Sequence, residues 1–403
     1  SSFFKNLIND LFLFILYVLN YLFESSNFNG IEFSSTNKIK KIIVSSQCEE
    51  GFDRGFYFKY KNYLLDYLEK VEFDEMASID IICSESFISC KKLTKIVIPF
   101  TCHAIGHKAF KDCINLKTVE FGTVNESTTK IKDKLESIGS EAFCNCSSLT
   151  SILIPPTIQE ILKGAFMNCI NLKHVNFGFR IFKSGTKQII NYYSFNCNNF
   201  VLIQANAFRN CSSLESFRIP SSCQNVGECA FMNCTSLRSI KFKGKDMFTI
   251  RPRTFYNCSS LTSFEYHGYC GSNFHIGHEA FMNCSSLTDI IIENMIKSKL
   301  KSLPNRLPCL DIRAFCSCSS LKIARFFIEN LMEICEKAFM NCSSLESIEI
   351  GSNYNSIIFN STAYIGVPKN LKVKLFIKQK DIRVFQPLKE EKQADRNEKI
   401  TLK

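Results

Sequence analysis

Ala-Phe-Cys-Asn-Cys-Ser-Ser-Leu-Thr-Ser-Ile-Leu-Ile, residues 142–154, is the stretch that decides the fold of this 403-residue chain. The same order returns at residues 280–292 and again at residues 338–350. Ten related copies place a phenylalanine at Phe87, Phe110, Phe143, Phe166, Phe208, Phe231, Phe255, Phe281, Phe315 and Phe339. Three of the nine spacings are 23 residues and two are 24, and insertions lengthen the others. A short fixed period of this kind predicts a solenoid in which each unit stacks on the next.

The spacing of side chains within one unit predicts its local structure. The pattern Leu-x-x-Ile-x-Ile at residues 93–98 ends in strict alternation, which predicts a strand with one buried face. Pro99 follows this strand directly and cannot donate a backbone hydrogen bond, so it ends the ladder. Gly106, in the Ile-Gly pair that comes next, suits a bend. Ala-Phe-x-x-Cys then spaces its Phe and Cys three residues apart, which predicts a short helical turn with both on one face.

A period of 20–29 residues is typical of leucine-rich repeats. We therefore predict an α/β leucine-rich-repeat solenoid, with a parallel β-sheet on the concave face and short helical turns on the convex face. The unit resembles the BspA-like class of 23-residue repeats over residues 83–350, with a degenerate closing unit at residues 371–375. The resemblance implies a surface protein that binds host or matrix proteins. Insertions and missing prolines depart from the family pattern and put the regularity of its curvature in doubt.

The repeats set the expected domain organisation. Residues 1–80 are expected to form an N-terminal cap region, residues 81–376 a solenoid of about ten units, and residues 377–403 a charged, disordered tail. The apolar run at residues 11–23 is shorter than the about 20 residues that a membrane-spanning helix requires, and is either a targeting segment or a capping helix. Membrane association therefore stays open. Residues 60–73 are predicted to form a helix of the cap.

Composition limits the class of function. The net charge is +11, but the Lys and Arg residues are dispersed, so we expect no nucleic-acid partner. Of 21 cysteines, ten occupy one repeat position, where Cys serves as a small buried hydrophobe. Disulfides between neighbouring units are the alternative. The cysteines of the repeat position are Cys90, Cys113, Cys146, Cys169, Cys211, Cys234, Cys258, Cys284, Cys318 and Cys342.

Few other residues have the spacing of a chemical site. The C-x-C pairs at Cys144 and Cys316 share their second cysteine with the repeat, which argues against a zinc site. A His/Cys group at residues 267–278 is interpreted as a polar loop, so we expect no metal, no cofactor and no catalytic residue. The repeated Asn-Cys-Ser step suits turn geometry. Asn125 and Asn360 are the better glycan candidates if the protein is secreted.

The predicted partner-binding surface is the set of outward strand positions on the concave face. These positions alternate with the buried ones, so the period locates them directly. Insertions at residues 122–136, 178–204 and 293–311 all leave one edge, just after a strand, and could add contacts. The candidate residues are Lys95, Glu120, His174, Asn176, Arg218, Lys241, Glu265, Asp289, Arg325 and Glu349.

Two hypotheses for function remain. The first is a non-enzymatic, cell-surface or secreted adhesion protein whose concave face binds a protein ligand such as a host or matrix protein. The alternative is an intracellular, cytoplasmic scaffold that uses the same face, with its buried cysteines reduced. An enzyme within the first 80 residues is a weaker third, because that region has no recognisable motif.

Overall fold

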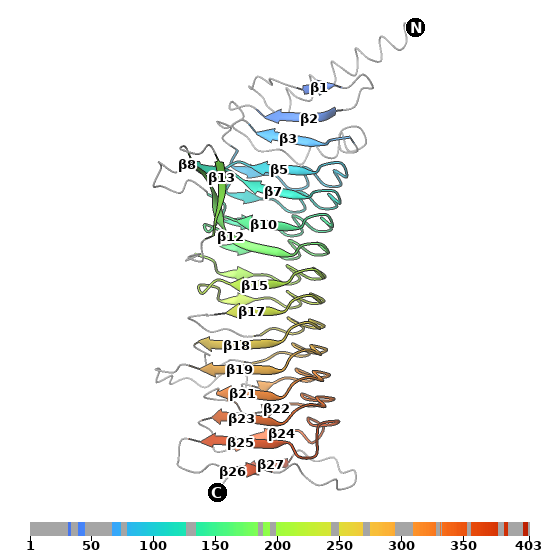
Figure 1. Cartoon of the computed structure of the whole chain (residues 1–403), viewed down its shortest axis with the longest axis vertical. Coiled ribbons are helices and arrows are strands. Elements are labelled where there is room, and N and C mark those ends of the chain that lie inside the picture. Colours follow the sequence, from blue (N-terminus) through green and yellow to red (C-terminus); the bar gives the residue numbers. More distant parts are fainter. Residues whose placement is uncertain are drawn as a thin grey trace, which may run out of the picture. The chain divides into compact units, whose positions relative to one another are not determined.

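The computed structural model describes residues 31–33, 39–44, 67–73, 79–125, 134–183, 188–193, 199–242, 250–268, 275–294, 309–327, 331, 333–352, 356–377, 383–385 and 398–401. The chain divides into two compact units. Unit 1 contains Ser1–Cys169 and Asn176–Phe195, and unit 2 contains Ile170–Val175 and Asn196–Lys403 (Figure 1). Each unit is a stack of similar rungs. The prediction for residues 11–23 lies outside the described residues.

Long parallel strands form one side of every rung, as the alternating pattern predicts. In unit 1 they are β2 (Ile39–Val44), β3 (Lys70–Phe73), β5 (Lys95–Ile98), β7 (Thr118–Phe121) and β10 (Ser151–Ile154), with β1 (Ile31–Phe33) antiparallel to β2. In unit 2 they are β15 (Ser216–Ile219), β17 (Ser239–Phe242), β18 (Ser263–Gly268), β19 (Asp289–Asn294), β21 (Ile323–Phe327), β23 (Ser347–Ser352) and β25 (Lys372–Ile377). Because β25 pairs in register with β23, and because Leu375 on β25 and Leu371 just before it are buried, the predicted closing unit is confirmed.

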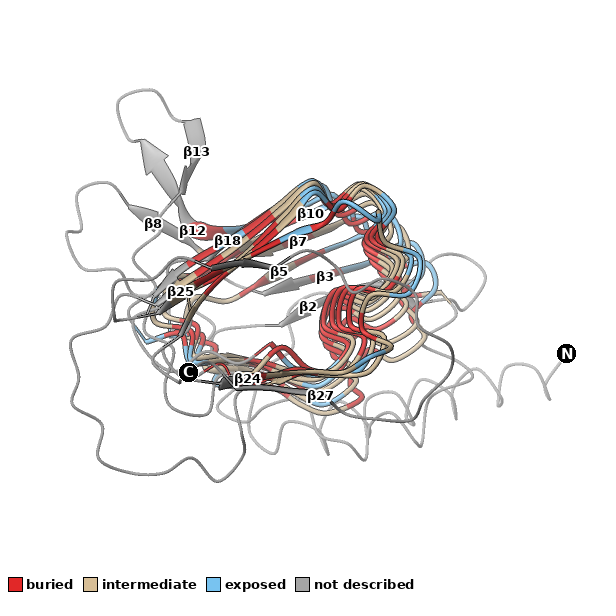
Figure 2. Cartoon of the chain, turned by 90° about the horizontal axis from the view of Figure 1, so that it is seen from below, coloured by how far each residue is buried: buried red, intermediate tan, exposed pale blue. Residues whose placement is uncertain are grey.

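In each unit a second set of short parallel strands, which the sequence did not predict, lies across the interior of the rungs from the long strands (Figure 2). Its unit 1 strands are β4 (Ile81–Ile82), β6 (Ala104–Ile105), β9 (Ser137–Ile138) and β11 (Glu160–Ile161). Its unit 2 strands are β14 (Leu202–Ile203), β16 (Asn225–Val226), β20 (Cys309–Leu310), β22 (Glu333–Ile334) and β24 (Ser356–Phe359), with single bridges at Ile250 and Ile276. Gly106 and Gly139 directly follow β6 and β9, and Gly227 directly follows β16. At Gly139 a Cβ would lie 2.5 Å from the carbonyl oxygen of Ile105, so close approach of rungs demands the glycine.

The Ala-Phe-x-x-Cys segments are turns, and the prediction of short helical turns is wrong. All 19 non-glycine residues of the described chain with positive φ fall two positions before or two positions after a repeat Phe. Glu141 and Asn145, for example, have φ of 55° and 62°, whereas an α-helix needs about −63° at every residue. Alternate N–H groups therefore point out of the rung. Phe143 N–H donates to the Ala165 carbonyl of the next rung at 2.7 Å.

The repeat phenylalanines form an interior column at the centre of each compact unit, as the predicted stacking of the repeats requires. In unit 1 the rings from Phe87 to Phe166 stack at centroid distances of 5.2–5.3 Å. In unit 2 those from Phe208 to Phe339 stack at 5.1–5.6 Å. The rings are fully buried. Burial of each is worth about 1.5–3 kcal/mol, so the column is a main source of stability in both units.

Two insertions of unit 1 form a small side sheet. Strand β12 (His174–Lys183) continues beyond its rung and pairs antiparallel with β13 (Gln188–Tyr193). It also pairs parallel with β8 (Thr123–Asn125), from the preceding insertion. The first two predicted insertions thus meet through backbone pairing. Of the third, residues 295–308 lie outside the described residues.

The chain ends differ from expectation at two places. Residues 70–73, predicted as part of a cap helix, are strand β3, which pairs with β5 and extends the ladder toward the N-terminus. Within the tail expected to be disordered, β26 (Arg383–Phe385) and β27 (Glu398–Thr401) pair antiparallel with β25 and β24. None of the described residues belongs to a helix with the length and apolar character needed to cross a bilayer.

Candidate partner-binding surface

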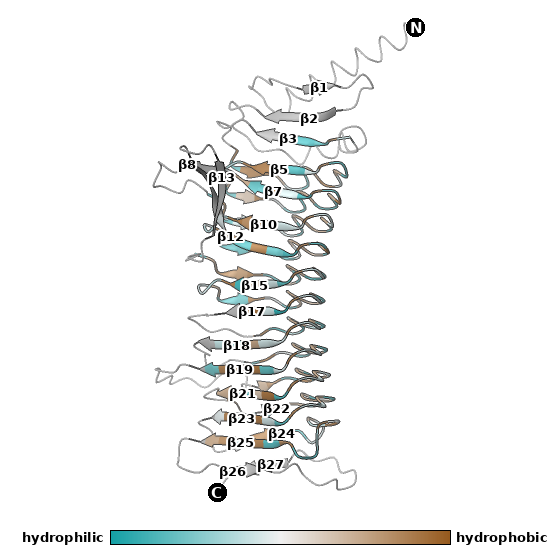
Figure 3. Cartoon of the chain, viewed as in Figure 1, coloured by the Kyte–Doolittle hydropathy of each residue, from teal (hydrophilic) through white to brown (hydrophobic). Residues whose placement is uncertain are grey.

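The strand side chains alternate between the interior and the outer surface of the sheet, as the period predicts. Burial along β5, β7 and β10 switches at every residue. Figure 3 shows that single strands such as β5 and β19 contain both hydrophilic and hydrophobic segments. The inward positions are mostly Ile, Val and Phe, whereas the outward positions differ in charge from one strand to the next. The outward face can therefore change without disturbing the core.

In unit 1 the structure brings together one predicted pair of site residues. Lys95 on β5 and Glu120 on β7 form an ion pair, with Nζ and Oε2 3.0 Å apart. The lysine side chain is 48% exposed, so water screens the attraction strongly. Asn176 is exposed on β12.

In unit 2 the residues predicted for the binding surface lie on successive strands. His174, Arg218 and Glu265 are exposed, and Asp289 is half-buried. The backbone of Lys241 pairs with that of Arg218 on one side and Glu265 on the other. The Lys241 side chain lies outside the described residues.

The last strands of unit 2 carry a charged row across three rungs. Glu349 on β23 accepts hydrogen bonds from Arg325 Nε on β21 at 2.7 Å and from Lys374 Nζ on β25 at 3.1 Å. Burial raises the pKa of Glu349, but the hydrogen bonds from Arg325 and Lys374 outweigh it and leave the pKa below its ordinary value. The carboxylate therefore stays charged at neutral pH and holds both cations in place. Lys374 was not among the predicted residues, because it lies beyond the last clear repeat.

A third outward position along these strands was also missed. Phe327, Gly351 and Phe376 are in register on β21, β23 and β25, two residues beyond the charged row. The two rings lie 5.4 Å apart at 41°. The repeat pattern ends before this position, but the alternation of Ile323-Ala-Arg-Phe-Phe327 continues through it and could have located it.

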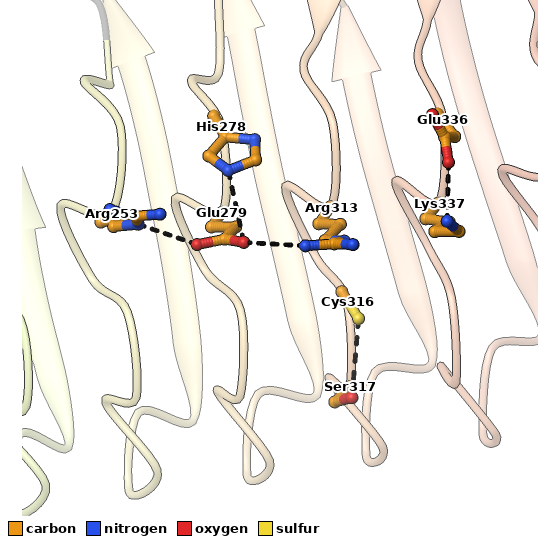
Figure 4. Close-up of polar contacts among 8 residues, drawn as sticks. All are labelled: Arg253, His278, Glu279, Arg313, Cys316, Ser317, Glu336 and Lys337. Atoms are coloured by element: carbon orange, nitrogen blue, oxygen red, sulfur yellow. Dashed lines mark hydrogen bonds and ion pairs between the residues drawn. The ribbon is translucent and has the colours of Figure 1, made fainter.

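The opposite, turn side of unit 2 carries a separate polar network. Glu279 lies between two arginines of neighbouring rungs, with Oε2 2.8 Å from Arg253 Nε and Oε1 3.3 Å from Arg313 Nη1 (Figure 4). His278 Nε2 also lies 3.3 Å from Oε1. The Glu279 side chain is only 9% exposed, so its charge requires these partners. The network joins rungs and has the character of a structural clamp.

A family model described as BspA type leucine rich repeat region (6 copies) matches residues 18–127, 60–177, 121–203, 201–303 and 299–366. The chain belongs to this BspA-type leucine-rich-repeat family. Repeat proteins of this kind are generally binding modules.

Several solved structures are similar to this BspA-type chain. A leucine rich cell surface protein from Faecalibacterium prausnitzii is 21% identical, over 88% of this chain and 96% of that one, with a TM-score of 0.33. The pneumococcal vaccine antigen PcpA is 17% identical over 87% and 78%, with a TM-score of 0.39. A leucine-rich repeat protein from Bacteroides ovatus is 18% identical over 87% and 99%, with a TM-score of 0.34. No curated protein matches the chain. Likeness at this level says nothing about a ligand.

The BspA-type repeat cysteines are buried thiols with a local structural role. Cys258 Sγ, for example, donates to the Phe231 carbonyl of the preceding rung at 3.2 Å, and the same bond recurs in both units. Burial raises the pKa of Cys258, so the thiol stays protonated and can donate. No disulfide joins the 18 cysteines that the structure describes. The second residues of the two C-x-C pairs, Cys146 and Cys318, make this same bond.

The repeat asparagines explain the Asn-Cys-Ser step. Seven of them occupy the position with positive φ after Phe, a conformation that Asn tolerates better than most residues. Their amides also form ladders between rungs, such as Asn168 Nδ2 to Asn145 Oδ1 at 2.7 Å in unit 1 and Asn233 Nδ2 to Asn210 Oδ1 at 2.8 Å in unit 2. Turn geometry is therefore confirmed as their role.

The other predicted sites give limited results. Among the described residues, no group of three or more His, Cys, Asp or Glu could hold a metal ion. The side chain of His267 and residues 269–274 lie outside that part of the chain, as does the Asn125 side chain. Asn360 accepts hydrogen bonds from Thr362 through Oδ1.

Proposed function

We propose that this BspA-type chain is a non-enzymatic recognition protein, at the cell surface or secreted, that binds a protein ligand through the outward face of its long strands. One observation carries the proposal: the outward strand positions are solvent-accessible and change in charge from rung to rung, while the inward positions repeat. Lys95 and Glu120 in unit 1, and Arg218 and Glu265 in unit 2, are examples. Charges arranged in this way orient a partner and speed its association.

Charge reversal on the strand face tests the proposal. The variants are Arg218→Glu, Lys241→Glu and Arg325→Glu, each measured against a solubilised basement-membrane extract coated on a biosensor. The matched control is Arg251→Glu, because Arg251 is an exposed arginine of the same unit that follows the second sheet. We expect the strand-face variants to slow association and the control to bind normally. If all three reversals bind like the unaltered chain, the strand face is not the binding surface.

An intracellular scaffold with reduced cysteines is the second candidate. The burial of the repeat thiols favours it, because such thiols need no oxidising compartment. Surface biotinylation of intact cells that produce the chain separates the two candidates. Labelling of the chain supports the surface protein, and a chain found only in the unlabelled cytosolic fraction supports the scaffold.

A further inference from the structure

The end of the strand face in unit 2 carries two partly exposed aromatic side chains that touch. Phe327 on β21 and Phe376 on β25 belong to strands two rungs apart, which places their backbones about 9.6 Å from each other. Their ring centroids nevertheless lie 5.4 Å apart. The rings therefore lean toward each other across the intervening strand β23. Both are half-buried, so part of each ring faces solvent.

Gly351 on β23 makes this contact possible. A Cβ at this position would lie 2.4 Å from Cδ1 of Phe327, so any side chain here displaces that ring. The corresponding outward position on the neighbouring strand β19 carries Glu293. Because the glycine has no side chain, the two aromatic rings can meet above it. Phe327, Gly351 and Phe376 therefore form a continuous apolar platform three strands wide.

The charged row borders the platform. Arg325, Glu349 and Lys374 precede Phe327, Gly351 and Phe376 by two residues, about 7 Å along each strand. Lys372 is exposed two residues before Lys374 on β25 and adds a third cation to this face. The bond to Glu349 uses Nε of Arg325, and a guanidinium has four further N–H donors on its terminal nitrogens. Cations held beside the apolar platform favour a ligand that carries both acidic and aromatic groups.

We infer that this platform anchors an acidic peptide segment of the partner that carries an aromatic side chain. The ligand ring packs on Phe327 and Phe376 over Gly351, and ligand carboxylates pair with Arg325, Lys374 and Lys372. Aromatic and arginine side chains grouped in this way are the residue types that dominate protein interfaces. The inference rests on the proposed function and adds the place and chemistry of its strongest contact.

The chain contains no tryptophan, so a tryptophan in the ligand reports binding directly. The probe is a short peptide with one tryptophan between two pairs of glutamates, titrated with the full chain while tryptophan emission is recorded. We expect a blue shift that saturates. Two control peptides, one with alanine for tryptophan and labelled by fluorescein, and one with lysines for glutamates, should bind at least about tenfold more weakly.

Variants of the chain locate the site. Phe376→Ala removes one ring and Gly351→Val displaces the other. Each variant should weaken binding of the acidic peptide by about tenfold or more. Lys374→Glu should weaken it and reduce the salt dependence of binding. Ile365→Ala is the matched control, because Ile365 is an exposed apolar residue of the last turn, and should change affinity less than about twofold. Because the peptide controls use the unaltered chain, the test holds even for a variant that fails to fold.

Several results overturn the inference. The first is the absence of a blue shift at a millimolar concentration of the chain. The second is a blue shift that survives both Phe376→Ala and Gly351→Val. The third is binding of the lysine peptide as tight as that of the glutamate peptide. Concentration-dependent dimerisation that Phe376→Ala abolishes would assign the platform to a second copy of the chain and also overturn it. If the peptide does not bind but Arg218→Glu still weakens binding to the basement-membrane extract, the platform is rejected as the binding site and the proposed function stands. If the peptide titrates as expected but the chain does not bind the extract, only the broader proposed function is rejected.

Discussion

Phe255→Leu is the most direct test of the energetics of the interior column. The Phe255 ring is fully buried in unit 2. It stacks on Phe231 at 5.6 Å and on Phe281 at 5.1 Å, and it meets Phe264 at 5.6 Å and 54°. Leucine preserves most of the apolar volume but none of these ring–ring contacts.

The three contacts give the expected magnitude. An aromatic pair contributes about 0.5–1.5 kcal/mol beyond its buried area, so three pairs contribute about 1.5–4.5 kcal/mol. Leucine recovers part of this through its own dispersion contacts. We therefore expect Phe255→Leu to lower the free energy of unfolding by about 1.5–3 kcal/mol, and Phe255→Ala, which also leaves a cavity, by about 3–5 kcal/mol. Phe143→Leu in unit 1 should cost less, because Phe143 has two stacked neighbours, Phe110 and Phe166, in the described contacts.

Urea unfolding followed by far-ultraviolet circular dichroism measures these differences, and native-state hydrogen exchange assigns them to a unit. Ile312→Ala is the control, because Ile312 is an exposed side chain beside a turn of unit 2, and should shift stability by no more than about 0.5 kcal/mol. A Phe255→Leu variant as stable as this control would refute the idea that stacked rings hold the rungs together. Equal losses for Phe255→Leu and Phe255→Ala would refute the separate cavity contribution.

Three further predictions concern titratable groups. Because burial raises the pKa of Cys258, its thiol should resist iodoacetamide at pH 8 in the folded chain and react in urea, as intact mass will show. Burial raises the pKa of Glu279, but hydrogen bonds from Arg253 and Arg313 and the charge of His278 leave it below its ordinary value. The Glu279 contribution to stability is then present above the unfolded pKa and lost as pH falls through the folded pKa, so the urea midpoints of the unaltered chain and Glu279→Gln should converge on acidification. The Tyr364 hydroxyl is buried without a hydrogen-bond partner among the described residues, so Tyr364→Phe should raise the free energy of unfolding by about 1 kcal/mol in the same assay.

The strand positions and the interior column follow from sequence because they depend on side-chain periodicity alone. Leu93, Ile96 and Ile98 alternate with Lys95 and Val97, and the structure buries the first set and turns out the second. The same rule located Arg325 and Glu349. It did not extend to Phe327 and Phe376, because strand length beyond the repeat depends on pairing with neighbouring rungs, which a single unit does not reveal.

The turns were mispredicted because spacing of three residues is ambiguous. Phe143 and Cys146 share a face in a helix, but they also share one in this turn, where Glu141 and Asn145 on either side of Phe143 are left-handed. The asparagines were the available signal: Asn145 and its equivalents occupy a left-handed position that no helix interior contains. The second sheet was missed for a related reason, since a two-residue strand such as β9 is too short to show a period.

The two sides of a rung differ in how freely their residues can change, and this argues for recognition on the strand side. On the turn side, two residues per rung adopt positive φ, and side chains such as Asn168 and Cys258 bond to the preceding rung. A substitution there disturbs two rungs at once. On the strand side, the sheet is held by backbone bonds, so residues such as Arg218 can vary at small cost in stability. A binding surface that must be tailored to its partner is therefore expected where Arg325 and Phe376 lie, and not along the turns.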